Sequence, residues 1–216
     1  MFKRIVFYAL IAAFSLNCSS LPRLGSSPRD PSIAIERPVV EARTPELREV
    51  LESARKQTKV TRNYTQEYFV IPYPNGDVPE DTGACTDVVI RSFRAAGVDL
   101  QKEVHEDMAK NFSSYPQKWG LAGTDTNIDH RRVPNLQTYF NRRGKSVPLT
   151  DDPKDYQPGD VVTWDLNGKG MTHIGIVSHV FNETTKHYYI IHNIGSGTRI
   201  EDRLFEWKVT GHYRYF

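Results

Sequence analysis

The stretch that decides the fold is residues 82–97, TGACTDVVIRSFRAAG. Its apolar residues Val89, Phe93 and Ala96 are spaced by four and three positions, which predicts an amphipathic helix. Cys85 stands where this helix begins. Because free backbone N–H groups and the helix dipole favour an anion at that end, we expect the Cys85 thiol to lose its proton more easily than an ordinary thiol. A thiolate is the nucleophilic form of cysteine, so Cys85 is the first candidate for chemistry.

The rest of the chain predicts helices first and strands afterwards. Three further helix starts are expected, at Thr44–Pro45, Asp99 and Val133–Pro134. Four later stretches are rich in β-branched and aromatic residues and are expected to be strands: 160–164, 173–177, 188–192 and 212–216. Helices followed by antiparallel strands predict an α+β fold.

Composition excludes several classes of protein. The 216 residues are 38% hydrophobic and 25% charged, which is typical of a soluble globular chain. With 28 Lys and Arg against 26 Asp and Glu, the chain lacks the strong basic excess that is typical of nucleic-acid-binding proteins. We therefore expect no nucleic-acid partner. Two cysteines are too few for a disulfide-stapled scaffold or a zinc ribbon. We expect no cofactor.

The first residues predict export. Residues 1–17 combine a short basic start with an apolar run of about a dozen residues, typical of a secretory signal. Cys18 follows at once, which resembles a bacterial lipoprotein signal and implies lipidation of Cys18. We therefore expect a membrane-anchored lipoprotein of the cell envelope, in the periplasm or at the outer membrane. A flexible tether is expected at 18–43 and a single domain at 44–216; a cleaved secretory signal and an uncleaved anchor are the alternatives.

Two of the seven histidines stand at the ends of consecutive expected strands. His173 begins the expected strand 173–177, and His192 ends the expected strand 188–192. If these strands form a hairpin, both rings can reach one edge of the sheet. One imidazole would then accept the Cys85 proton while the second polar group orients it. By contrast, His187 lies near an expected hairpin tip and is expected to be exposed.

Several motifs together resemble the NlpC/P60 group of papain-like cysteine peptidases. They are the Cys85 helix start, the His173–Val177 run HIGIV, the polar end of the next strand and the turn Pro158–Gly159–Asp160. Longer motifs resemble a bacterial exported family that is catalogued only as a domain of unknown function. These motifs lie at residues 73–79, 85–91, 127–136 and 192–195, and the likeness covers roughly residues 45–216.

The resemblance implies a papain-like fold, with N-terminal helices packed on a small antiparallel sheet or half-barrel. By position it implies that Cys85 is the nucleophile, His173 the general base and His192 the orienting third member. Asn193 is the alternative third member, since papain-like enzymes also use Asn there. Tyr73 stands twelve residues before Cys85, about where the peptidoglycan enzymes place a Tyr near the substrate amine.

Two further positions bear on the substrate. Ala84 precedes Cys85 where the peptidoglycan enzymes have Asp, so the carboxylate that contacts the substrate amine in those enzymes is missing here. Arg131, within the cluster Asp129–His130–Arg131–Arg132, is a candidate to hold a substrate carboxylate. The alternative is a charged loop that is salt-bridged internally. No recognised ligand spacing appears, and we expect no metal site.

These features predict a cysteine hydrolase of the cell envelope that cleaves an amide or peptide bond. The resemblance and the expected anchor favour peptidoglycan stem peptides as the substrate. The alternatives are a catalytically inactive binding module on the same fold, a cysteine acyltransferase or transpeptidase, and a toxin delivered to other cells.

Overall fold

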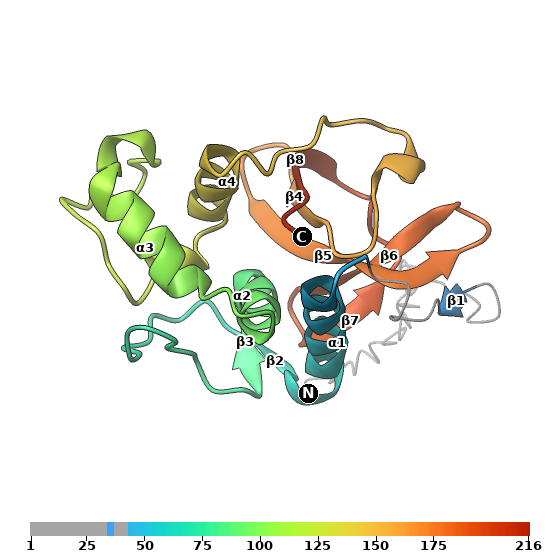
Figure 1. Cartoon of the computed structure of the whole chain (residues 1–216), viewed down its shortest axis with the longest axis horizontal. Helices are drawn as coiled ribbons and strands as arrows, with labels where there is room; N and C mark the ends of the chain where they lie inside the picture. Colours follow the sequence, from blue (N-terminus) through green and yellow to red (C-terminus); the bar gives the residue numbers. More distant parts are fainter. Residues whose placement is uncertain (1–33, 37–42) are drawn as a thin grey trace, which may run out of the picture. The chain divides into compact units, whose positions relative to one another are not determined.

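The structure, a computed structural model, describes residues 34–36 and 43–216 (Figure 1). All of them belong to one unit, Pro31–Phe216. The expected signal at 1–17, the expected lipidation site Cys18 and most of the expected tether at 18–43 lie outside the described residues. Within the described ranges, no helix has the length and apolar character needed to cross a bilayer.

The described chain is α+β, as the sequence predicts. Its α-helices are α1 (Pro45–Val60), α2 (Cys85–Ala95), α3 (Leu100–Lys110) and α4 (Val133–Arg142), with short 3-10 turns η3 (Phe112–Ser114), η4 (Asp129–Arg131) and η5 (Pro153–Asp155). Its strands are β1 (Ala34–Glu36), β2 (Asn63–Tyr64), β3 (Thr82–Gly83), β4 (Val161–Asp165), β5 (Thr172–Asn182), β6 (His187–Asn193), β7 (Thr198–Glu201) and β8 (Lys208–Tyr213).

The helices begin where their capping residues predict. The Thr44 hydroxyl accepts a hydrogen bond from the Leu47 N–H at 3.1 Å, directly before Pro45 opens α1. The Asp99 carboxylate accepts from the Gln101 N–H and so caps α3. These local bonds satisfy N–H groups that a helix leaves free at its start.

One antiparallel sheet carries most of the strands. Its order is β7-β6-β5-β4-β8, and β1 also pairs with β5. The expected strand 212–216 instead begins at Lys208 and ends at Tyr213, and β7 was not predicted. Three residues of the expected tether, Ala34–Glu36, thus extend the sheet.

The sheet separates two apolar clusters. Ile174, Ile176 and Ile191 pack with Val89 and Phe93 of α2 and with side chains of the other helices. On the other face, the apolar residues are Tyr156, Val162, Trp164, Val177, Ile190 and Leu204. Since side chains alternate along a strand, odd-numbered residues at the start of β5 share the face of Val177. His173 therefore belongs to the face opposite α2.

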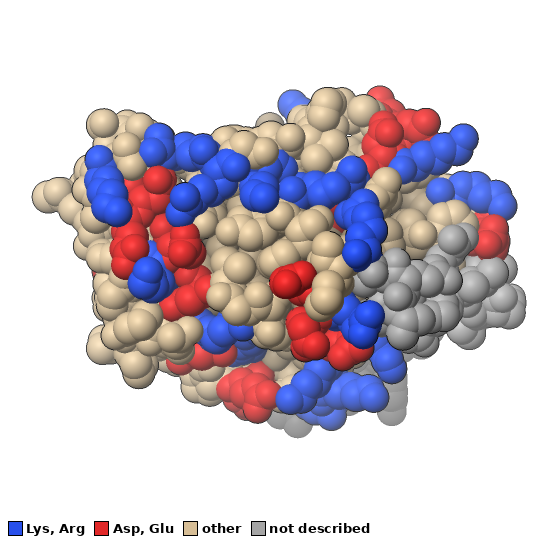
Figure 2. Space-filling model, in the orientation of Figure 1, with Lys and Arg blue, Asp and Glu red and all other residues tan. Residues whose placement is uncertain are grey.

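Helices α1 and α2 cover one side of the sheet, with α2 against β5 and β6 (Figure 1). The N-terminus of α2 therefore lies beside the strands that carry the two candidate histidines. The surface view shows both signs of charge on one face of the molecule (Figure 2). This agrees with the near balance of 28 basic and 26 acidic residues.

Candidate functional site

Cys85 is the first residue of α2, and the chain around it is held in place. Asp87 turns back to accept a hydrogen bond from the Ala84 N–H at 2.6 Å. Arg131 binds both carboxylate oxygens of Asp87, at 3.0 Å each, and donates to the Glu67 carbonyl at 2.8 Å. A bidentate pair of this kind fixes geometry as well as charge. The start of α2 is thereby tied to two loops.

The Cys85 sulfur is buried, with 6% of the residue exposed. Burial raises the pKa of its thiol to about 12, and the Asp87 carboxylate adds to the rise. Backbone N–H groups of Ile174, Thr86 and Cys85 itself face the sulfur and lower the pKa, but less than burial raises it. The expectation of an easily ionised thiol is therefore wrong, because desolvation outweighs the helix N-terminus.

His173 and His192 meet, as the hairpin argument predicts. His173 Nε2 lies 2.8 Å from His192 Nδ1, and His192 Nε2 lies 3.1 Å from a Glu201 carboxylate oxygen. The hydrogen bond from His192 lowers the pKa of Glu201, so Glu201 is ionised and only accepts. His192 must then carry its proton on Nε2 and, when neutral, accept on Nδ1. His173 consequently donates from Nε2 and keeps Nδ1 as a free base.

Gly175 makes this contact possible. A Cβ built on Gly175 would lie 2.7 Å from the Ile190 side chain and 3.1 Å from the His192 Cβ. Because strand residues two apart share a face, that space lies beside the His173 ring. The glycine of the HIGIV motif therefore leaves room for His192 to reach His173.

The His173 imidazole does not contact the Cys85 thiol directly, but the residues on either side of His173 lie at the thiol or its cleft. Of the two neighbours of His173, Ile174 directs its N–H to the sulfur, and Thr172 lines the same cleft as Cys85. In the described part of the chain, the His173 ring and the Cys85 sulfur form no hydrogen bond. Burial, followed by the nearby His192, lowers the pKa of His173 to about 3. The resting pair is thus a neutral thiol and a neutral imidazole.

Two tryptophans enclose the histidines. The Trp164 ring lies 5.8 Å from His173, and the Trp207 ring lies 5.8 Å from His173 and 6.2 Å from His192. These apolar rings exclude water, which explains why the charged form of His173 is disfavoured.

Cys85 opens onto a cleft of about 430 Å³. Residues from several loops and from the start of α4 form its walls, among them Tyr64, Lys118, Trp119, Arg132, Pro134 and Thr172. Tyr64 is placed there by strand pairing, because β2 runs parallel to β3 with Tyr64 opposite Gly83. Burial raises the pKa of Tyr64, which lines the same cleft as Cys85.

Arg131 lines the cleft, but its guanidinium is already occupied. Its donors are directed to Asp87 and Glu67, and only 8% of the residue is exposed. Its ion pair is with Asp87 of α2, outside the cluster 129–132, whereas the pair within that cluster is Arg132 with Asp129 at 3.4 Å. The neighbouring Arg132 also lines the cleft and is only partly buried.

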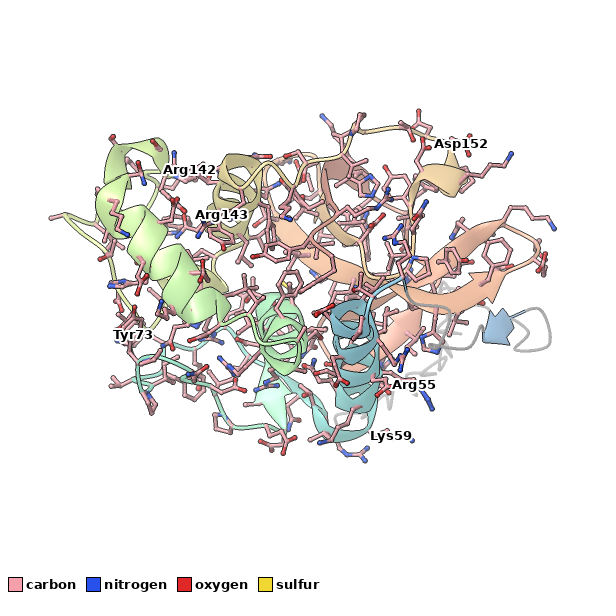
Figure 3. The ribbon with its side chains drawn as sticks, in the orientation of Figure 1. Arg55, Lys59, Tyr73, Arg142, Arg143 and Asp152 are labelled. Atoms are coloured by element: carbon pink, nitrogen blue, oxygen red, sulfur yellow. The ribbon has the colours of Figure 1, made fainter. Side chains whose placement is uncertain are left out.

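Tyr73 and Asn193 lie elsewhere. Tyr73 is 40% exposed, contacts the His105 ring edge-on at 5.1 Å and appears beside α3 (Figure 3). It is not among the residues that line the Cys85 cleft. The Asn193 amide donates to the carbonyls of Asn63 and Gly83, whereas His192 contacts His173.

Sequence reasoning missed Glu201 and Tyr64, and within the cluster 129–132 it singled out Arg131 and not Arg132. Glu201 and His192 lie on one face of the β6–β7 pair, since Ile190 is opposite Glu201 and His192 is opposite Arg199. An acidic residue in a strand that follows His192 was the available signal, but β7 itself was not predicted. Similarly, His187 is buried against Asp202 at 3.2 Å rather than exposed.

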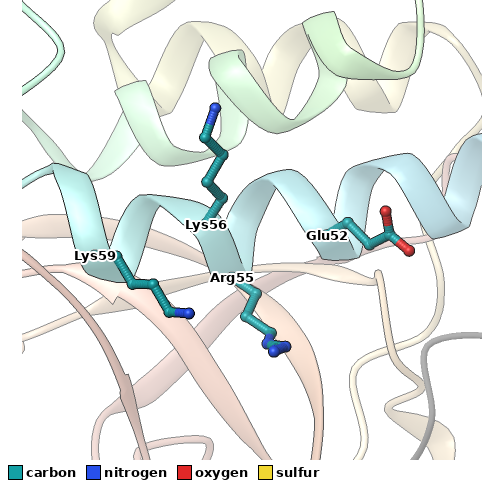
Figure 4. Close-up of a pocket in the computed structure, with 4 residues that line it drawn as sticks. All are labelled: Glu52, Arg55, Lys56 and Lys59. Carbon is teal, nitrogen blue, oxygen red and sulfur yellow. The ribbon is translucent and has the colours of Figure 1, made fainter.

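A second cavity of about 340 Å³ runs along α1, lined by Glu52, Arg55, Lys56 and Lys59 (Figure 4). Lys56 leaves the helix on the side opposite Arg55 and Lys59 in that view. None of these four side chains offers a thiol nucleophile such as that of Cys85. As for metals, the described residues contain no group of three or more His, Cys, Asp or Glu arranged to hold an ion.

The chain was compared with known proteins. The model of DUF1287, a domain of unknown function, matches residues 51–215. A relative from Escherichia coli (strain K12), described as "Uncharacterized protein YijF", is 53% identical over 167 residues, which are 77% of this chain and 80% of that protein. A solved structure described as NlpC1 from Trichomonas vaginalis aligns at 12% identity with a TM-score of 0.44, over 82% of this chain and 46% of that one. Since the family model and the relative both span about three quarters of the sequence, this chain belongs to the DUF1287 family.

Proposed function

We propose that the protein is a papain-like cysteine hydrolase of the cell envelope that cleaves an amide bond in peptidoglycan stem peptides. The observation that carries the proposal is the arrangement of Glu201, His192 and His173 in one hydrogen-bonded series that ends beside the Cys85 cleft. The motifs that resemble NlpC/P60 peptidases support it independently. Export and lipidation at Cys18 are part of the proposal.

In the first step, the Cys85 sulfur attacks the substrate carbonyl while its proton moves to His173 Nδ1. Both groups are neutral at rest, so proton transfer accompanies attack instead of preceding it. The N–H groups of Cys85 and Thr86 at the start of α2 stabilise the oxyanion. His173 then donates the proton to the leaving amine, the C–N bond breaks, and an acyl-enzyme on Cys85 remains.

In the second step, water replaces the amine. His173 Nδ1 accepts a proton from water as the water attacks the thioester, and the C–S bond breaks to release a carboxylic acid and the Cys85 thiol. His192 stabilises the positive charge that develops on His173 in both steps, and Glu201 holds His192 in the required tautomer.

An inactive binding module is the second candidate. The observations that favour it are the absence of a thiol–imidazole hydrogen bond in the described residues and Ala84 in place of an acid before Cys85. In that case the cleft would bind the same peptides without cleaving them.

The test is digestion of peptidoglycan by the full-length chain in water enriched in oxygen-18. The expected result is a new amine and a new carboxylate that carries one heavy oxygen, detected by mass spectrometry. Cys85→Ser and His173→Gln should each abolish the products. The matched control is His212→Gln, which alters a buried histidine of the same sheet outside the cleft.

Unchanged peptidoglycan, or products that persist in Cys85→Ser, would refute the hydrolase. New cross-links without incorporation of heavy oxygen would instead identify a transpeptidase. Peptide binding without turnover would support the second candidate, the inactive binding module.

A further inference from the structure

The Cys85 cleft has an unbalanced charge. Three cationic residues line it, Lys118, Arg131 and Arg132, and among the described residues no Asp or Glu does. The chain as a whole is nearly neutral, so the imbalance is local. Because like charges in a narrow site are costly without a counterion, such a lining favours an anionic ligand.

Two of the three cations are available to a ligand. Arg131 is neutralised by its bidentate bond to Asp87, which lies behind the cleft wall. Arg132 has a weaker partner, since its Nη1 is 3.4 Å from the Asp129 carboxylate. Lys118 is exposed at the mouth. The net positive charge of the cleft thus comes from Arg132 and Lys118.

Trp119 holds the Arg132 guanidinium in position. The guanidinium carbon lies 4.2 Å from the centre of the Trp119 ring, a cation–π contact. The contact restrains the guanidinium; with Nη1 directed to Asp129, Nε and Nη2 make no hydrogen bond within the described part of the chain. A planar fork of donors matches a carboxylate, which accepts two parallel hydrogen bonds.

We propose that the cleft selects peptides with a free carboxylate next to the scissile amide, and that Arg132, stacked on Trp119 and assisted by Lys118, binds this carboxylate. The proposal rests on the proposed function, of which it names the substrate class. Recognition of an anion instead of a substrate amine also fits Ala84, which offers no carboxylate beside Cys85.

The test uses two synthetic stem peptides that differ only in whether the carboxylate next to the scissile amide is free or amidated. Binding is measured by calorimetry on the full-length Cys85→Ala chain, and turnover on the unmodified chain. The free acid should bind about tenfold or more tightly than the amide, as expected for a charged hydrogen-bonded pair. Adding Arg132→Gln should reduce the preference to about twofold or less.

Two controls accompany the test. Arg143→Gln makes the same change on an exposed arginine beside α4, paired with Glu103 and outside the cleft (Figure 3), and should leave the preference intact. Arg132→Lys keeps the charge but loses the planar fork, and should restore only part of the preference. Thermal unfolding of each variant shows whether the fold is intact.

Equal binding of the two peptides, binding of neither, or an unchanged preference in Arg132→Gln overturns the proposal. Selective binding to Cys85→Ala without turnover by the unmodified chain supports the carboxylate site and refutes the hydrolase. Turnover of both peptides at equal rates supports the hydrolase and refutes the selectivity.

Discussion

Two buried histidine networks share one sheet. In one, His212 Nε2 lies 2.8 Å from Asp160, which also binds Arg214 at 2.6 Å and accepts from the Gln157 N–H. In the other, His173, His192 and Glu201 form a series. Both networks pair imidazole with a carboxylate, and both are covered by aromatic rings. The two networks differ in where their outermost histidine stands relative to the Cys85 cleft.

The His212 network is sealed inside the protein: among the described residues His212 Nδ1 has no hydrogen-bond partner and is buried, and His212 does not line the Cys85 cleft. Burial alone would raise the pKa of Asp160, but hydrogen bonds from Arg214 and His212 lower it below its usual value. Tyr156 stacks on His212 at 4.3 Å. By contrast, His173 of the second network directly follows Thr172, which lines the Cys85 cleft. The difference teaches that a histidine–carboxylate pair becomes a candidate for catalysis only where its outermost histidine stands next to a cleft that a substrate can enter.

The largest expected effect comes from exchanging the same residue in each network. His173→Gln should lower kcat/KM on the cleaved peptide by about 1000-fold, because it removes the general base, and should lower the free energy of unfolding by only about 1 kcal/mol, through loss of the buried hydrogen bond to the neutral His192 side chain. His212→Gln should leave kcat/KM within about twofold but lower the free energy of unfolding by about 2 kcal/mol, through loss of a buried hydrogen bond to a carboxylate. Steady-state kinetics and urea unfolding measure the two effects. The reverse pattern would show that the networks have been assigned the wrong roles.

A smaller effect is expected at Glu201, a positioning residue that acts through His192. Glu201→Gln should lower kcat by about tenfold with KM unchanged, since an amide can donate or accept and no longer fixes the tautomer. Glu201→Asp should recover part of the loss because it remains an acceptor only. If kcat is unchanged in Glu201→Gln, Glu201 does not orient His192 for catalysis.

A third prediction sharpens the comparison through pH. The pKa of His173 is about 3 in the folded protein against an ordinary 6.5, so the unfolded chain binds the proton first. Stability should therefore fall as pH drops from 6.5 toward 3, by about 1.4 kcal/mol per pH unit for this group. His173→Gln should reduce the slope of unfolding free energy against pH by about that amount; an identical slope would indicate that His173 is charged in the folded state.

Much of the fold could be predicted from local signals. Thr44, Asp99 and the apolar spacing in α2 act within a few residues of themselves, and the helices begin where these signals occur. Strand β7 escaped prediction because its four residues contain only two β-branched ones, and pairing with β6 determines it. The boundaries of β8 also depend on pairing, here with β4.

The candidate site was predictable only in part. Contact between His173 and His192 follows from their positions in a hairpin. The raised pKa of the Cys85 thiol could not be predicted from the sequence, because burial of Cys85 depends on how α2 packs against β5. Nor could the sequence distinguish Arg131 from Arg132, since only the fold directs one guanidinium to Asp87 and the other to Trp119.

The neutral state of Cys85 also has a consequence for oxidative damage. Peroxide and disulfides react with the thiolate form of cysteine, and the extent of reaction follows the thiolate fraction and the exposure of the sulfur. A buried thiol with its pKa raised to about 12 offers little of either. The same burial would therefore preserve Cys85 as a free thiol in the oxidising surroundings that the proposed export implies.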